Sequence, residues 1–358
     1  MSKKYKVINI ATHTEAPKSS VLLIYTGGTF GMVFDEDGSL KPFNFSLVLD
    51  KIPELQMLDL RLTVISFPEP VDSSNVSVEH WQAMAHIVKD HYYQFDAFVI
   101  LHGTDTMAYT ASALSFMLKG LNKPVILTGA QIPIGATRSD ARENLITALE
   151  IASKKNGSGP MLNEVALYFN YYLLKGNRSQ KIRSSNFAAF ESENFPYLAE
   201  SGVEIVFNES FLRAYDPHSK LEYYPDMDSN VVILKLFPGI SKEVVKSILE
   251  IKGLKGVVIE SYGSGNVMTW RWFTRLLKEA VSRGIILYNV SQCMGGSVVQ
   301  GRYETSKMLS EIGVVSGHDI TTEAALAKLM HLLGNEKDSE VIKEKLKMPL
   351  RGELTAQD

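Results

Sequence analysis

Threonine, aspartate and glycine residues follow two apolar runs of this chain. The sequence Thr-Gly-Gly-Thr at residues 26–29 comes shortly after the apolar run 21–24, and His-Gly-Thr-Asp-Thr at residues 102–106 directly follows the run 98–101. In an open parallel sheet, ligands bind outside the carboxyl ends of the strands. Two hydroxyls and a carboxylate at such an edge are the groups of a nucleophilic site.

The two glycines of the first motif let the backbone turn sharply and direct N–H groups into a cleft, where they can hold a phosphate or an oxyanion. Thr29 stands at the centre of this turn. A phosphate loop is not indicated, because no Gly-Lys-Ser or Gly-Lys-Thr follows, and the Gly-x-Gly-x-x-Gly pattern of dinucleotide sites is missing. On this motif alone, a tight turn with a threonine cap is the simpler explanation.

The second motif combines a hydroxyl with a carboxylate. Asp105 can bind the ammonium group of a substrate, and Thr104 can act as a second nucleophile or a proton carrier. Alternatively, either residue caps the helix that follows, which is a common role of both types. His102 precedes the loop and is expected to be structural rather than a general base.

Further candidates lie outside these two motifs. Asp72, Ser73 and Ser74 form a polar loop after a strand and can hydrogen-bond a small polar substrate, or simply turn the chain and cap a helix. Lys181 can activate a neighbouring hydroxyl if it is partly desolvated, although most lysines are solvated. Cys293 has no histidine nearby in the sequence, so we expect a buried thiol without a catalytic role.

Composition narrows the class of protein. The chain has 358 residues, of which 45% are hydrophobic and 22% charged, which is typical of a globular enzyme. The net charge of −3 argues against a nucleic-acid partner. One cysteine permits no intramolecular disulfide and fits a reducing compartment. The histidines lack metal-ligand spacing, and neither a signal peptide nor a membrane span of about 18 apolar residues is apparent, so a cytoplasmic protein is expected.

Strand-like runs alternate with helix-like stretches, which predicts an α/β protein. The expected strands are 21–25, 62–67, 97–101, 124–128, 164–169, 231–236, 256–260 and 285–290. The expected helices are 77–93, 106–119, 139–154, 242–251, 270–283 and 321–333. We predict a larger N-terminal domain with a mainly parallel sheet flanked by helices, and a smaller C-terminal α/β domain. The expected segments are a flexible extension (1–20), the catalytic domain (21–207), a polar linker (208–230) and the C-terminal domain (231–358).

Taken together, the motifs resemble the bacterial asparaginase/glutaminase family, specifically the cytoplasmic type I asparaginases. The similarity extends from about residue 21 to residue 333, nearly the whole chain. The motifs that carry it are residues 24–29, 72–74, 101–106 and 128–131 (Thr-Gly-Ala-Gln), with 176–178 and 291–294 typical of the type I branch.

The resemblance implies hydrolysis of L-asparagine to L-aspartate and ammonia without a metal or cofactor, with glutamine as a possible second substrate. By motif match, Thr29 is the primary nucleophile. Thr104, Asp105 and Lys181 form a second group, in which Lys181 tunes Thr104 and Asp105 holds the α-ammonium of the substrate. The substrate-binding residues implied are Asp72, Ser73, Ser74, Thr104 and Asp105.

The chain departs from the family in the loop after the nucleophile. The family carries a tyrosine there that helps to activate the hydroxyl, whereas the aligned position here is Ser39 and residues 31–40 contain no tyrosine. A tyrosine from elsewhere, a water molecule, or greater dependence on Thr104 and Lys181 are the alternatives. The resemblance further implies a homodimer or homotetramer, and a regulatory asparagine site that includes Cys293.

Two other functions fit the same residues. The amidase subunit of a tRNA-dependent amidotransferase carries an extra N-terminal domain, for which the ~20 residues before Val21 are too few. A non-catalytic amino-acid-binding protein would retain Asp105 and the Ser73 loop, but would need neither a second threonine nor a lysine. The presence of Thr29, Thr104 and Lys181 together favours the enzyme.

Overall fold

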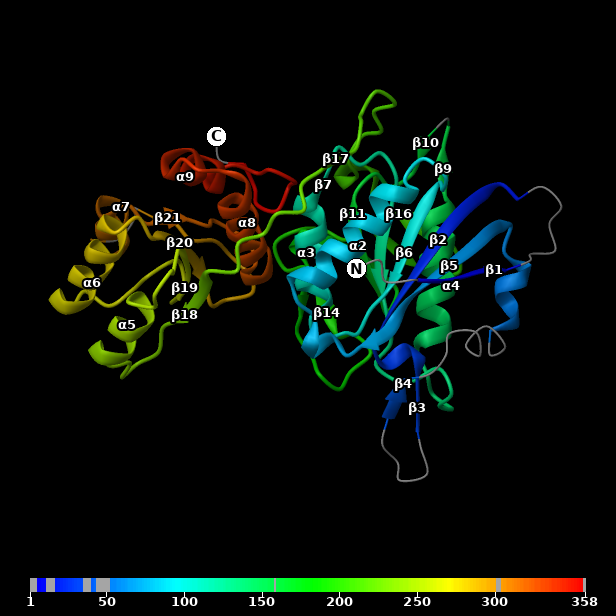
Figure 1. The fold of residues 1–358 in the computed structure, drawn as a ribbon, viewed down its shortest axis with the longest axis horizontal. Coiled ribbons are helices and arrows are strands. Elements are labelled where there is room, and N and C mark those ends of the chain that lie inside the picture. Colours follow the sequence, from blue (N-terminus) through cyan, green and yellow to red (C-terminus); the bar gives the residue numbers. More distant parts are fainter. Residues whose placement is uncertain are drawn as a thin grey trace. The chain divides into compact units, whose positions relative to one another are not determined.

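The chain divides into two compact units, Met1–Tyr223 and Tyr224–Asp358 (Figure 1). The computed structural model describes residues 5–10, 17–34, 40–42, 52–157, 159–300 and 304–356. Each unit is built on its own sheet, and the predicted α/β class with a larger N-terminal sheet is confirmed. The two units are described separately below.

Among the described residues, nine strands form the sheet of the first unit, in the order β1-β5-β2-β6-β8-β11-β12-β15-β16. The central five run parallel: β5 (Leu60–Val71), β2 (Ser19–Gly27), β6 (Ala97–Leu101), β8 (Val125–Thr128) and β11 (Val165–Phe169). Antiparallel strands extend both edges: β1 (Lys6–Ile10), β12 (Tyr172–Lys175), β15 (Ala199–Ser201) and β16 (Ile205–Phe207).

The order of the parallel strands determines where a ligand can bind. From β2 the chain moves to one side to form β5, and it then returns to the other side of β2 to form β6. The strand order therefore reverses at the β2–β6 pair. In doubly wound sheets, the crevice outside the carboxyl ends of such a pair is the usual ligand site. The first motif follows β2 and the second follows β6, so both lie at this crevice.

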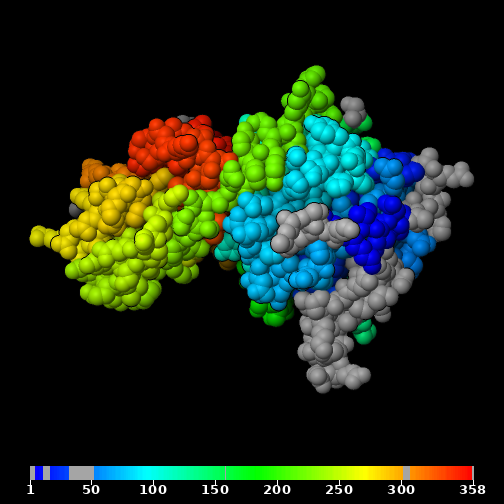
Figure 2. Space-filling model, viewed as in Figure 1, coloured from blue at the N-terminus to red at the C-terminus, as the bar shows by residue number. Residues whose placement is uncertain are grey.

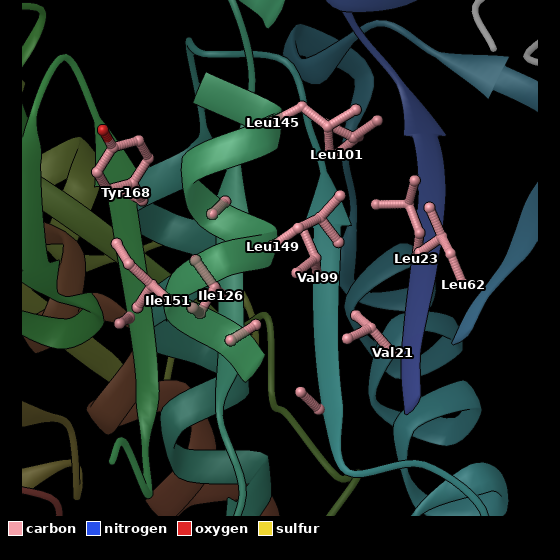
Figure 3. Packing of buried hydrophobic residues seen from close by; sticks show 14 of the residues in the cluster. Val21, Leu23, Leu62, Val99, Leu101, Ile126, Leu145, Leu149, Ile151 and Tyr168 are labelled. Carbon is pink, nitrogen blue, oxygen red and sulfur yellow. The ribbon is translucent and has the colours of Figure 1, made fainter. Parts of the chain in front are cut away.

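Helices cover the central strands, which explains their continuous apolar sequences. The helices are α2 (Val78–His91), α3 (Met107–Met117) and α4 (Ala141–Ser153). Figure 3 shows Leu145 and Leu149 of α4 pointing toward Leu101 and Val99 of β6, in one buried cluster. The alternate residues of β6, Phe98 and Ile100, point to the opposite face and are fully buried as well. The strand ends are thus held by a core on both faces.

The second unit contains a parallel sheet in the order β18-β19-β20-β21. Its strands are Val231–Lys235, Gly256–Ser261, Ile286–Ser291 and Val315–Ser316. Its helices are α5 (Lys242–Leu249), α6 (Arg271–Ser282), α7 (Glu304–Ile312), α8 (Thr322–Asn335) and α9 (Ser339–Lys347). Val257 and Ile259 of β19 belong to one core cluster and Val258 to another, because alternate strand residues point to opposite faces. The C-terminal residues, red in Figure 2, form part of the surface of this unit.

The predicted strands and helices correspond to observed elements whose ends differ by a few residues, but two segments need correction. Lys6–Ile10, expected in a flexible extension, pair antiparallel with β5, where Ile8 and Ile10 pack against the core. The extension is therefore wrong for these residues. The predicted linker 208–230 contains the short helix Glu209–Phe211 and the strand β17 (Glu222–Tyr223), which pairs with β7 (Leu118–Lys119). Most of that segment therefore folds with the first unit.

Candidate active site

Three loops meet at the carboxyl ends of β5, β2 and β6. Gly28 has a φ of +80°, and a Cβ atom there would lie 2.5 Å from the Cα and N atoms of Gly103. A Cβ atom on Gly103 would lie 2.6 Å from Oγ of Ser73. Only glycine permits such close approach of backbone and side chain. The glycines of the two motifs therefore bring the loops that carry Thr29, Ser73 and Thr104 into direct contact.

Two of the motif threonines hold these loops together. Oγ1 of Thr26 donates a hydrogen bond to the Leu101 carbonyl at 2.8 Å, and Oγ1 of Thr106 donates to the Ser73 carbonyl at 2.7 Å. Their hydroxyls are thus committed to backbone acceptors. Thr29, by contrast, begins the short 3₁₀ helix Thr29–Gly31 directly after the glycine turn and is only partly buried. The fixed loops leave Thr29 and Thr104 as the candidate reactive hydroxyls.

The structure brings together Thr104, Asp105 and Lys181, as the resemblance predicts for the second group. Lys181 lies on β13 (Gln180–Lys181), and its Nζ atom is 2.8 Å from Oγ1 of Thr104 and 2.6 Å from Oδ1 of Asp105. The lysine side chain is 16% exposed, whereas that of Asp105 is 65% exposed. A largely desolvated ammonium group thus donates to the threonine hydroxyl, which is the arrangement required to polarise it. The carboxylate of Asp105 faces solvent, where it is accessible to a cationic substrate group.

Asp72 and Ser74 have a local structural role in the third loop. Asp72 precedes the 3₁₀ helix Ser73–Asn75, and its Oδ1 atom accepts hydrogen bonds from the Ser74 N–H (2.9 Å) and hydroxyl (2.8 Å). The capping alternative is therefore realised for Asp72. Ser73 is buried against Gly103, while Asp72 and Ser74 are exposed. Substrate binding by these three residues stays a prediction.

His102 is a buried, neutral residue below the second motif. Nδ1 of His102 lies 2.7 Å from the Gly103 carbonyl oxygen, which can only accept, so Nδ1 carries the proton of the neutral ring. Nε2 is then the acceptor for the Thr110 hydroxyl (3.0 Å), and Oγ1 of Thr110 accepts in turn from the indole N–H of Trp81 (3.0 Å). Burial lowers the pKa of His102 to about 4. The ring thus positions the peptide that carries Thr104, which fits the expected structural role.

This histidine should make folding stability depend on pH. The pKa of His102 is about 4 in the folded chain, against the usual ~6.5 of an unfolded chain. Between these two pKa values the unfolded chain binds more protons than the folded chain, so folding stability is lost as the pH falls from the higher value to the lower one. We expect a loss of about 2 kcal/mol between about pH 7 and about pH 5 from His102 alone. Urea unfolding at both pH values measures it. His102→Asn, which has no titrating ring, should show a shallower dependence; an equal slope in both chains would contradict the assignment.

Cys293 and Ser39 complete the predicted site positions. Cys293 is exposed directly after β20, and its backbone N–H donates to Oγ of Ser291 at 3.0 Å. The expectation of a buried thiol was therefore wrong, because the chain leaves the core at the strand end. Ser39 lies outside the described residues. Within the part of the chain that the structure describes, no three histidine, cysteine or acidic residues cluster as a metal site, and no helix has the length and apolar character to cross a membrane.

One residue of this site had no predicted role. Gln131 follows β8, and its Oε1 atom accepts a hydrogen bond from Oγ1 of Thr104 at 3.0 Å. In the sequence, residues 128–131 indicate only the family resemblance. The signal that could have indicated a role is position, because Gln131 follows the strand next to β6 and so lies at the same edge of the sheet.

Comparisons with known proteins cover almost the whole chain. Residues 20–213 match the family model "Asparaginase, N-terminal", and residues 230–346 match "Glutaminase/Asparaginase C-terminal domain". L-asparaginase 1 of Escherichia coli is 42% identical over 95% of this chain and 99% of its own length. The human 60 kDa lysophospholipase is 39% identical over 95% of this chain and 62% of its own length. The crystal structure of L-asparaginase I from Vibrio cholerae has a TM-score of 0.84 and 38% identity, covering 94% of this chain and 99% of that one. This chain therefore belongs to the asparaginase family.

Proposed function

We propose that this chain hydrolyses L-asparagine to L-aspartate and ammonia, with Thr29 as the nucleophile. The observation that carries the proposal is the hydrogen-bonded group of Thr104, Lys181 and Asp105, next to the point where Gly103 packs against Gly28 in the loop of Thr29. Membership of the asparaginase family supports the same reaction. A binding protein for amino acids would need Asp105 but neither of the two candidate reactive hydroxyls.

The proposed substrate is a small zwitterion that the site would hold at its charged end. Asp105 would bind the α-ammonium group, because its carboxylate is exposed and already oriented by Lys181. Asp72, Ser73 and Ser74 would bind the amino-acid end from the adjacent loop. Fixing both ends of a small substrate against a nucleophile can contribute roughly 7–11 kcal/mol to catalysis.

The proposed reaction begins with attack of the Thr29 oxygen on the side-chain amide carbon. The amide carbonyl becomes an oxyanion, which backbone N–H groups of the glycine turn can stabilise. The C–N bond then breaks, and the leaving nitrogen takes up a proton to depart as ammonia. Water then attacks the carbon of the Thr29 ester, the bond between that carbon and the Thr29 oxygen breaks, and the Thr29 oxygen regains its proton, so asparagine and water give aspartate and ammonia. Thr104 and Lys181 would assist the proton transfers in these steps.

Ammonia release tests the proposal. The purified chain is assayed with asparagine, glutamine and lysophosphatidylcholine, the last because a human relative is named a lysophospholipase. We expect ammonia from asparagine without tRNA, which also separates this function from an amidotransferase subunit. Binding of asparagine without release of ammonia would support the amino-acid-binding alternative. Fatty acid release without ammonia would overturn the proposed reaction class.

We further propose a cytoplasmic homodimer or homotetramer in which Cys293 forms part of a regulatory asparagine site. The exposure of this thiol is compatible with such a site, and the single cysteine fits a reducing compartment. We expect a sigmoidal dependence of rate on asparagine concentration that becomes hyperbolic in Cys293→Ser. A hyperbolic curve for the unmodified chain would contradict regulation, and light scattering measures the assembly.

A further inference from the structure

We propose that Gln131 is a positioning residue that holds the proton of Thr104 and thereby keeps the threonine oxygen directed at Lys181. The inference rests on the proposed function, in which Thr104 takes part in proton movement. It assigns a role to a residue outside the predicted nucleophile, substrate-binding and lysine positions. The argument follows from the donors and acceptors around one hydroxyl group.

The orientation of the Gln131 amide is determined by its other contacts. Its Nε2 atom lies 3.1 Å from the Ser184 carbonyl oxygen and 3.0 Å from the Asn186 carbonyl oxygen. Carbonyl oxygens only accept hydrogen bonds, so the NH₂ group must face these two atoms. The amide oxygen must then face Thr104, 3.0 Å away. Toward Thr104, the Gln131 side chain can therefore only accept a hydrogen bond.

The lysine determines the direction of the threonine proton in the same way. A charged ammonium group has three donors and no acceptor. Lys181 donates to Oγ1 of Thr104 and to Oδ1 of Asp105. The Thr104 hydroxyl cannot return a proton to this group, so its proton is donated to Gln131. One lone pair of the threonine oxygen remains for a further donor. Gln131 therefore fixes which side of Thr104 accepts and which side donates.

The backbone of Gln131 is also held. Its N–H donates to both carboxylate oxygens of Asp140, at 3.1 and 3.0 Å, and Asp140 also accepts from the N–H of Ile132 at 3.0 Å. The side chain of Asn144, on α4, donates to Asp140 at 3.2 Å. The turn after β8 is thus tied to the start of α4. A glutamine fixed at both ends can orient a hydroxyl with little loss of entropy.

The test uses Gln131→Met, which is close in length but has no acceptor. We expect kcat for asparagine to fall about 10–100-fold while KM changes less than about 3-fold, because the Gln131 side chain hydrogen-bonds Thr104 but none of the other predicted binding residues. Gln131→Glu keeps an oxygen that can accept from Thr104 and should restore part of kcat. It also keeps the proposal testable if the methionine variant does not fold, which thermal unfolding reveals.

A structural explanation predicts a different pattern. Loss of the bonds to Ser184 and Asn186 could loosen that segment without involving Thr104. Gln131→Met is therefore combined with Thr104→Val. If Gln131 acts through the hydroxyl, Gln131→Met lowers kcat less than about 3-fold in the Thr104→Val background; a 10–100-fold loss in that background would overturn the proposal. Full activity in Thr104→Val alone would instead contradict the proposed function of Thr104. Unchanged kcat in Gln131→Met, with Thr104→Val impaired, would overturn the role of Gln131 alone.

Discussion

Replacing Thr29 by alanine is expected to lower kcat/KM for asparagine by about 10⁴-fold or more, because it removes the hydroxyl that we propose as the nucleophile. The proposed substrate-binding residues Asp105 and Ser73 should remain in place, since they belong to other loops. We therefore expect aspartate to bind Thr29→Ala with nearly unchanged affinity, as measured by calorimetry, while a coupled assay of ammonia release reports the lost activity.

Thr29→Ser is the matched control, because it retains a hydroxyl at the same backbone position. It should keep measurable activity, whereas Thr29→Ala should not. Lys181→Met should give a loss of about 10²–10⁴-fold, as expected for a group that assists proton transfer. Full activity in Thr29→Ala would show that another group attacks the amide. Equal losses in the alanine and serine variants would point to a packing defect instead.

Tyr25 is one candidate for the group that activates Thr29, but the structure disfavours it. Tyr25 lies on β2 just before the motif, and a Cβ atom on Gly31 would fall 1.9 Å from its hydroxyl oxygen, so the phenol packs against the turn that carries Thr29. Burial raises the pKa of Tyr25 well above its ordinary value. This phenol therefore stays protonated at neutral pH and cannot serve as a general base there. A route through Thr104 and Lys181 is consistent with this exclusion.

The sequence predicted the parallel strands because their apolar runs are continuous and short. Residues 97–101 match β6, since helices on both faces require apolar side chains at every position. The antiparallel extension was missed because β15 and β16 have three residues each, too few for a period to be visible. The helices α7 and α9 were missed as well. Short elements depend on tertiary contacts more than on local pattern.

The candidate site was only partly predictable for a similar reason. The loops after β2 and β6 could be placed at one edge from strand order alone. The contact of Lys181 with Thr104 joins residues 77 positions apart, and no local pattern indicates it. The family resemblance suggested that contact. The role of Gln131 required the positions of the Ser184 and Asn186 carbonyl groups, which only the folded chain provides.

A buried ion pair in the second unit carries the other large predicted effect. Lys328 on α8 and Glu353 near the C-terminus are fully buried, and Nζ of the lysine lies 2.7 Å from Oε1 of the glutamate. The lysine also donates to the carbonyl oxygens of Leu346 and Met348. Glu353 accepts from the N–H of Leu350 at 3.0 Å. The pair thus fastens the C-terminal segment to α8 and the end of α9.

Removing one member of this pair should be costly, because the other charge is left buried without its partner. We expect Lys328→Met to reduce the unfolding free energy of the second unit by about 3–5 kcal/mol, as measured by urea unfolding. The double variant Lys328→Met, Glu353→Gln should recover part of the loss, since neither charge then remains. A loss below about 1 kcal/mol in the single variant would contradict this assignment, since even an ordinary hydrogen bond contributes that much. Failure of the double variant to recover would mean that the backbone acceptors of Lys328, rather than the charge pair, hold the C-terminal segment in place.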